Sequence, residues 1–171
     1  MNNGKITFIL GGSRSGKSSF SIKSASKLQG SKAFIATAQA LDDEMNDRIE
    51  RHKQERSAAW RTFEEPIALP QIIIDNGNRY DVILIDCLTL WLSNLIMNDT
   101  DVESAIESML SALETCSSSL FVVSNEVGMG IVPENALARR FRDLSGTLNR
   151  RVAEISDEVY LITAGLPLKI K

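Results

Sequence analysis

The chain has 171 residues, which is long enough to bury a substantial core, and we expect one domain over residues 1–171. Its net charge of −3 excludes a whole-chain electrostatic attraction to nucleic acid or to an anionic membrane. The two cysteines, Cys87 and Cys116, lack metal-ligand spacing, and no apolar stretch is long enough to span a bilayer. We therefore predict a cytoplasmic protein with reduced cysteines, no nucleic-acid partner and no stable membrane insertion.

Short apolar runs alternate along the chain with stretches of helical periodicity. The runs predict strands over residues 6–10, 33–36, 82–85, 120–123, 159–163 and 168–170. The periodic stretches predict helices over residues 18–28, 43–57, 67–75, 102–116 and 137–155. We take Pro66 as the proline that opens the third of these helices. Alternating strands and helices predict a parallel sheet that is covered on both faces.

The first predicted strand runs directly into Gly11-Gly12-Ser13-Arg14-Ser15-Gly16-Lys17-Ser18, which matches the pattern G-x-x-x-x-G-K-S/T in full. Glycines allow successive N–H groups to point at phosphate oxygens, and the following helix directs its positive end at the same charge. Lys17 is placed to reach the β- and γ-phosphates, and the Ser18 hydroxyl to bind magnesium. The pattern predicts an α/β P-loop NTPase fold, RecA-like, with a mostly parallel sheet flanked by helices. The alternatives are a glycine-rich turn without a ligand and, for Arg14, a solvated side chain.

Asp86 follows the apolar run 82–85, where the magnesium-binding Walker-B acid of P-loop enzymes lies. Its alternative role is that of helix N-cap for a segment starting at Leu88.

The only histidine of the chain, His52, lies on a charged segment that is predicted to be helical. Arg48, His52 and Arg56 are spaced by four residues and would share one helix face, with Arg51 and Lys53 beside the imidazole. Nearby cations disfavour the imidazolium, which keeps a histidine neutral and nucleophilic near neutral pH. The alternative is a solvated charged helix with an incidental histidine.

Together these motifs resemble the bifunctional adenosylcobinamide kinase / adenosylcobinamide-phosphate guanylyltransferase family of cobalamin biosynthesis. The phosphate-binding loop alone occurs in thousands of proteins. The string from Asn125 to Pro133, combined with the histidine segment, is specific to far fewer proteins. The matching segments cover nearly the whole chain: 11–18, 35–39, 43–45 with Arg48, Ile49 and His52, 60–62 with Glu64, Asp86, 124–135, Arg139, 141–143 and Gly146.

The resemblance implies that one nucleotide site serves two reactions. In the first, ATP or GTP phosphorylates the aminopropanol hydroxyl of adenosylcobinamide, with Lys17 as a catalytic residue. In the second, the catalytic histidine, which falls on His52, attacks the α-phosphate of GTP, expels pyrophosphate and passes GMP to adenosylcobinamide phosphate. The product is adenosylcobinamide-GDP, and the family assembles as a homo-oligomer, with a trimer expected.

The resemblance also implies which residues contact the nucleotide and Mg²⁺. Ser18 and Asp86 would bind the metal, although some members carry glutamate at the position of Asp86. Glu64 could accept hydrogen bonds from the guanine edge, or be a surface acid before Pro66. Besides the loop 11–18, the implied nucleotide contacts are Ala36, Thr37, Ala38, Lys53, Gln54, Glu55, Arg56, Glu64 and Asp86.

Glu126 follows another apolar run and has three possible roles. It is a second candidate for magnesium, a candidate for the base of the kinase step, or a buried partner of an arginine such as Arg139. Two other functions remain open for the chain as a whole. One is a small-molecule P-loop kinase without guanylyltransferase activity, and the other is a regulatory NTP-binding module that turns over no metabolite.

Overall fold

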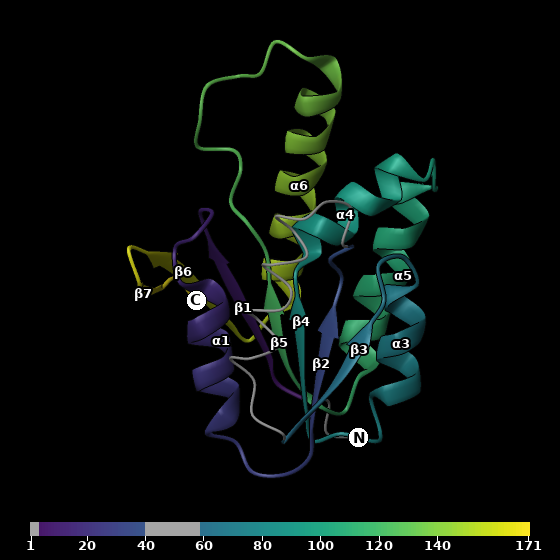
Figure 1. Cartoon of the computed structure of the whole chain (residues 1–171), viewed down its shortest axis with the longest axis vertical. Coiled ribbons are helices and arrows are strands. Elements are labelled where there is room, and N and C mark those ends of the chain that lie inside the picture. Colours follow the sequence, from purple (N-terminus) through teal and green to yellow (C-terminus); the bar gives the residue numbers. More distant parts are fainter. Residues whose placement is uncertain (1–3, 40–58) are drawn as a thin grey trace.

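The computed structural model describes residues 4–39 and 59–171. Within these residues seven strands form one sheet of order β3-β2-β4-β5-β1-β6-β7 (Figure 1). All neighbouring strands are parallel except β6 and β7, which form an antiparallel hairpin at one edge. The strands are β1 (Ile6–Gly11), β2 (Lys32–Ala36), β3 (Trp60–Glu64), β4 (Val82–Asp86), β5 (Ser119–Val123), β6 (Glu158–Thr163) and β7 (Leu166–Lys169).

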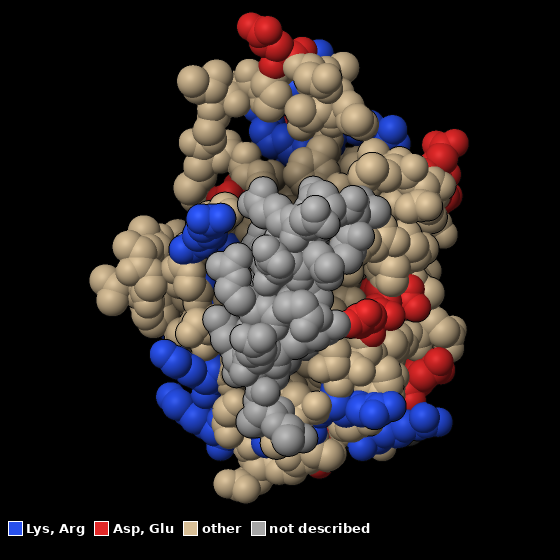
Figure 2. Space-filling model, viewed as in Figure 1, with Lys and Arg blue, Asp and Glu red and all other residues tan. Residues whose placement is uncertain are grey.

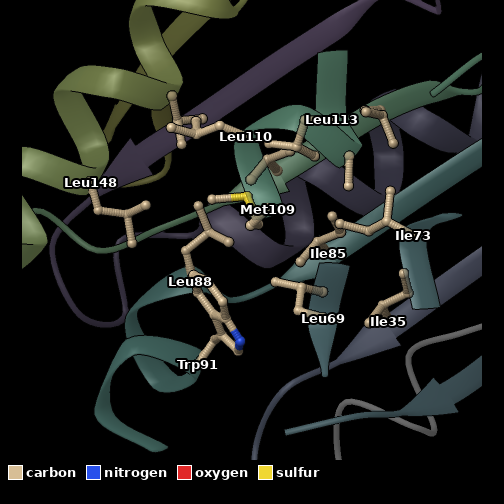
Figure 3. Packing of buried hydrophobic residues seen from close by; sticks show 14 of the residues in the cluster. Ile35, Leu69, Ile73, Ile85, Leu88, Trp91, Met109, Leu110, Leu113 and Leu148 are labelled. Atoms are coloured by element: carbon tan, nitrogen blue, oxygen red, sulfur yellow. The ribbon is translucent and has the colours of Figure 1, made fainter. Parts of the chain in front are cut away.

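The described helices cover the two faces of the sheet unequally. Helix α1 packs on one face, with Ala25 in a buried cluster that includes Ile9 and Leu84. The other four helices pack on the opposite face, around a larger cluster that includes Trp91 and Met109 (Figure 3). The helices are α1 (Lys17–Ser26), α3 (Leu69–Asn76), α4 (Leu88–Met97), α5 (Val102–Thr115) and α6 (Ala136–Ile155).

This architecture confirms the predicted α/β fold with a mostly parallel sheet flanked by helices. Each of the six predicted strands is present, with ends that differ by one or two residues. Strand β3 was not predicted, because Trp60-Arg61-Thr62-Phe63-Glu64 at the sheet edge mixes charged with apolar residues and is only partly buried. The antiparallel β7 follows from a two-residue turn at Ala164 and Gly165, which both have positive φ, as hairpin turns of this length require.

The helix predictions need two corrections. Helix α4 was not among the predicted helices, and the proline that opens α3 was misassigned. Helix α3 begins at Leu69, with Pro70 in its first turn, so Pro66 is not the proline that opens it. The predicted helix over residues 43–57 lies outside the described residues. None of the described helices is both long and apolar enough to cross a membrane.

Candidate active site

The carboxyl ends of the parallel strands bring most of the predicted site residues to one edge of the sheet. In the strand register, Glu64 is opposite Ala36, Ala36 is opposite Asp86, and Asp86 is opposite Val123. Val123 is opposite Ile9, two residues before the phosphate-binding loop, which we define as residues 11–18. Ligands of open α/β sheets bind at this edge, so the fold places the candidate residues where a nucleotide would bind.

The phosphate-binding loop makes a tight turn between β1 and α1. Gly16 occupies the N-cap position of α1 with φ 99°, a conformation that favours glycine. A Cβ atom on Gly11 would lie 2.4 Å from the Ile162 carbonyl oxygen, so the loop packs directly against β6. The backbone N–H of Gly165 donates to the Ser15 carbonyl oxygen at 2.9 Å, which fixes the loop to the β6–β7 turn.

The loop has the features of an anion site. Lys17 is only 7% exposed, and its ammonium donates to the Gly12 carbonyl at 2.6 Å, so its charge is held over the loop. The first turn of α1 contains no acidic residue, and its Gly16 cap has no side chain to occupy the helix N–H groups. The buried Ser15 hydroxyl finds no hydrogen-bond partner among the described residues. Arg14 is exposed on the same loop.

Asp86 and Ser18 form the second part of the site. The Ser18 hydroxyl donates to Asp86 Oδ2 at 2.7 Å and thereby joins the first turn of α1 to the end of β4. Cys87 is the N-cap residue of α4, so the alternative role of Asp86 as that cap does not hold. A hydroxyl next to a carboxylate is a donor set that fits Mg²⁺, which proteins commonly bind through one or two carboxylates together with substrate phosphates. The described residues contain no group of three or more acidic, histidine or cysteine side chains that could hold a metal ion without a substrate.

Thr37 is fully buried and supports Asp86 from the neighbouring strand. Its hydroxyl accepts from the Cys87 backbone N–H at 2.8 Å and donates to the Cys87 carbonyl at 2.7 Å. Its own backbone N–H donates to the Asp86 carbonyl at 3.2 Å, and its carbonyl accepts from Asn94 Nδ2 at 2.8 Å. The side chain of Thr37, which was predicted as a nucleotide contact, is thus used inside the protein, while Ala36 and Ala38 are partly exposed beside it.

Cys87, next to Asp86, is not a nucleophile candidate. Burial, and secondarily the charge of Asp86, raises the pKa of its thiol to about 11, so the thiol stays protonated at neutral pH. Cys87 and Cys116 are both buried and free of disulfides.

The segment after β5 is fixed from three sides. Ser124 and Glu126 donate their backbone N–H groups to the carbonyls of Ile9 and Gly11 at 3.0 Å each. The backbone N–H of Asn125 donates to Thr89 Oγ1 at 2.7 Å, and its carbonyl accepts from Asn149 Nδ2 at 3.0 Å.

Sequence reasoning missed Thr89 and Asn149, which no motif marks.

Arg139 donates to the Pro133 and Glu134 carbonyls, and Glu126 accepts from the Gly128 N–H at 2.6 Å. Glu126 and Arg139 therefore have other partners, and the alternative in which they form a buried pair is wrong.

The remaining candidates divide into one residue at the sheet edge and one group outside the described residues. Glu64 is exposed at the end of β3, which is four strands from β1, or about 19 Å at the usual strand spacing. His52 and the four residues after it, Lys53, Gln54, Glu55 and Arg56, lie outside the described residues, so their position relative to the loop stays a prediction.

Comparison with known proteins assigns the family. Residues 7–170 match the model of the family described as "Cobinamide kinase / cobinamide phosphate guanyltransferase". The bifunctional adenosylcobalamin biosynthesis protein CobU of Escherichia coli K12 is 39% identical, over 97% of this chain and 99% of its own length. The corresponding proteins of Pseudomonas aeruginosa, CobP, and of Salmonella typhimurium, CobU, are 41% and 40% identical over 95% and 97% of this chain, and over 95% and 99% of their own lengths. With its phosphate-binding loop, Asp86 and matching sequence over nearly its whole length, the chain belongs to the cobinamide kinase / cobinamide phosphate guanyltransferase family.

Proposed function

We propose that this protein phosphorylates adenosylcobinamide and then converts the product to adenosylcobinamide-GDP. The phosphoryl donor is ATP or GTP, and the guanylyl donor is GTP. The observation that carries the proposal is the Ser18–Asp86 hydrogen bond of 2.7 Å beside a complete phosphate-binding loop, in a chain that matches the family from residue 7 to residue 170.

In the kinase step, the aminopropanol hydroxyl attacks the γ-phosphorus of the NTP and the nucleoside diphosphate leaves. Lys17 and the N–H groups at the start of α1 stabilise the negative charge on the phosphate oxygens. Ser18 and Asp86 would hold Mg²⁺, which supplies further positive charge to the β- and γ-phosphates when bound. This assignment is supported by the buried position of Lys17 and by the Ser18–Asp86 contact.

In the guanylyl step, a ring nitrogen of His52 attacks the α-phosphorus of GTP and pyrophosphate leaves. The P–N bond of the histidine–GMP intermediate is then broken by a phosphate oxygen of adenosylcobinamide phosphate, which takes the GMP. A covalent intermediate divides a difficult reaction between two anions into two steps. The assignment is supported by the uniqueness of His52 in the chain and by the basic residues at Arg48, Arg51 and Lys53, which can offset charge on the leaving pyrophosphate.

Nucleotide selection is assigned to Glu64, with Ala36, Ala38 and the segment from Lys53 to Arg56 as further contacts. A carboxylate accepts hydrogen bonds from the N1–H and amino group of guanine, and adenine offers no such pair. The place of Glu64 at the sheet edge, about 19 Å from β1, suits a contact with the base end of a nucleotide whose phosphates lie on the loop.

We also propose that the protein is a cytoplasmic homo-oligomer, with a trimer as the expected state. Two exposed apolar surfaces support the association: Met129, Ile131 and Val132 on the loop after β5, and Leu166 and Leu168 on β7. Light scattering of the purified protein tests this part, and a monomer at micromolar concentration contradicts it.

A product assay separates the proposal from its alternatives. Adenosylcobinamide, Mg²⁺ and GTP are incubated with the protein, and the corrinoids are separated by chromatography. We expect adenosylcobinamide-GDP from the wild-type protein and adenosylcobinamide phosphate alone from the His52→Asn variant. A wild-type protein that stops at adenosylcobinamide phosphate would be a plain kinase, and one that binds GTP without converting the corrinoid would be a regulatory module. Either result overturns the proposed function.

A further inference from the structure

The two proposed reactions differ in what the acceptor must lose. The acceptor of the kinase step is an alcohol, whose oxygen must give up a proton as its bond to phosphorus forms. The acceptor of the guanylyl step is a phosphate monoester, which is mostly a dianion at neutral pH, so its attacking oxygen carries no proton that must be removed. A single site that performs both reactions therefore needs a general base for the first and none for the second acceptor.

The topology places one carboxylate between the phosphate-binding loop and the magnesium carboxylate. Strand β5 lies between β1, which leads into the loop, and β4, which ends at Asp86. Glu126 is the first acidic residue after β5, and its backbone N–H donates to the carbonyl of Gly11, the first residue of the loop. Its position is therefore tied to the loop that would bind the γ-phosphate.

The segment that carries Glu126 is well anchored. Thr89 of α4 and Asn149 of α6 hold the N–H and the carbonyl of Asn125, the residue before it. Thr89 and Asn149 are both buried, at 6% and 5% exposure. A catalytic group must be held by such supporting contacts if its geometry is to be productive.

The carboxylate itself is oriented and open to a ligand. Glu126 is partly exposed, and its Oε1 accepts from the Gly128 N–H at 2.6 Å. An ionised carboxylate still has acceptor capacity on its second oxygen. A Cβ atom on residue 128 would lie only 2.9 Å from Glu126 Oε1, so any larger residue than Gly128 would push the carboxylate out of its observed position.

Among the residues that the structure describes, two other carboxylates on these strand ends and their loops are less suited to take the proton. Asp86 accepts from Ser18 and is the candidate for holding the metal. Glu134 is exposed at the far end of the segment between β5 and α6. This segment stands away from the sheet (Figure 1), and few charged side chains lie on it (Figure 2). Of these carboxylates, only Glu126 is both joined to the loop and not paired with Ser18.

We propose that Glu126 is the general base of the kinase step and has no catalytic part in guanylyl transfer. The inference rests on the proposed function. As the aminopropanol oxygen bonds to the γ-phosphorus, its proton moves to the Glu126 carboxylate. The bond between the γ-phosphorus and the bridging oxygen breaks, and the nucleoside diphosphate leaves with that electron pair. The proton then returns from Glu126 to water.

Glu126→Gln tests the proposal, because glutamine keeps the acceptor for the Gly128 N–H and removes the base. The kinase rate is measured with adenosylcobinamide, and the guanylyltransferase rate is measured separately with adenosylcobinamide phosphate and GTP. We expect kcat of the kinase step to fall about 100-fold or more, with KM for adenosylcobinamide and the guanylyltransferase rate changed by no more than about threefold. Glu134→Gln, a matched loss of charge on the same segment, should leave both rates within about twofold of wild type. Gly128→Ala, which displaces the carboxylate without removing it, should lower the kinase rate selectively and by less.

The outcomes separate this inference from the proposed function. A wild-type protein without either activity contradicts the proposed function itself. If the wild type has both activities, a Glu126→Gln variant with a normal kinase rate overturns the base, and equal losses in both rates make Glu126 part of nucleotide or metal binding. Thermal unfolding of each variant shows whether a loss of both rates comes from misfolding. For a misfolded Glu126→Gln, a Gly128→Ala variant that lowers the kinase rate alone supports the inference, and one without that selectivity overturns it.

Discussion

Replacing Thr37 with valine tests whether its hydroxyl holds the end of β2 to the residue after Asp86. Valine has nearly the same shape, so the change removes two hydrogen bonds, of 2.7 and 2.8 Å, without opening a cavity. Thr37 is 0% exposed and Cys87 is 6% exposed, so water does not readily replace the lost partner.

The expected cost follows from what each backbone group of Cys87 retains. The Cys87 N–H loses the Thr37 hydroxyl, and an unsatisfied buried donor costs about 1–3 kcal/mol. The Cys87 carbonyl still accepts from the Trp91 N–H at 3.2 Å, so it is not left without a partner. Losing its hydrogen bond from the Thr37 hydroxyl therefore costs only the net free energy of one hydrogen bond, about 0.5–1.5 kcal/mol. The sum is about 1.5–4.5 kcal/mol, which for a chain of this size lowers Tm by about 3–18 °C.

The assay is urea unfolding followed by circular dichroism, with Thr37→Ser as the control. Serine keeps the hydroxyl and loses one buried methyl group, so it should cost only about 1 kcal/mol. Because the hydroxyl also fixes the backbone next to Asp86, Thr37→Val should weaken binding of magnesium–GTP more than Thr37→Ser does. A valine variant as stable as the serine variant would refute the structural role assigned to the hydroxyl.

Three further predictions concern other parts of the molecule. Lys17→Ala should abolish both reactions, because the described residues contain one phosphate-binding loop; a kinase or guanylyltransferase rate near wild type would require a second nucleotide site. Glu64→Gln should weaken GTP binding more than ATP binding by about 1–3 kcal/mol, and equal losses in a calorimetric titration would remove Glu64 from base recognition. Hydrogen bonds from Lys169 and Lys5 lower the pKa of Glu158 from 4.5 to about 2, so its contribution to stability is present above pH 4.5 and is lost as the pH falls towards 2. Glu158→Gln should therefore be less stable than wild type at pH 7, and the difference should shrink as the pH falls below 4.5 and become small near pH 2; an unfolding midpoint difference as large at pH 2 as at pH 7 would contradict this assignment.

The phosphate-binding loop could be predicted from sequence because its chemistry is local. Eight consecutive residues carry the turn, the cation and the candidate metal ligand, and a strand leads into them. Asp86 could be predicted for the same reason, since it ends a buried apolar run. The sheet register then brings Asp86, Ala36 and Glu64 into one row, which the sequence does not show without the strand order.

The supporting contacts could not be predicted because their partners are far apart in the chain. Thr37 and Cys87 are separated by 50 positions, and Asn149 and Asn125 by 24. A threonine before an alanine, or an asparagine in the middle of a helix, gives no local signal of such a partner. Strand β3 was missed because an edge strand has no continuous apolar run, and α3 was misplaced because both Pro66 and Pro70 are compatible with a first turn.

The most direct test of the account is covalent labelling of the protein by GTP. The wild-type protein and the His52→Asn variant are incubated with Mg²⁺ and GTP labelled at the α-phosphate, denatured, and freed of unbound nucleotide. The account predicts a label on the wild-type protein that acid removes and base does not, as a phosphoramidate requires, and no label on the variant. A label that persists on His52→Asn, or a wild-type protein that forms adenosylcobinamide-GDP without becoming labelled, would contradict it.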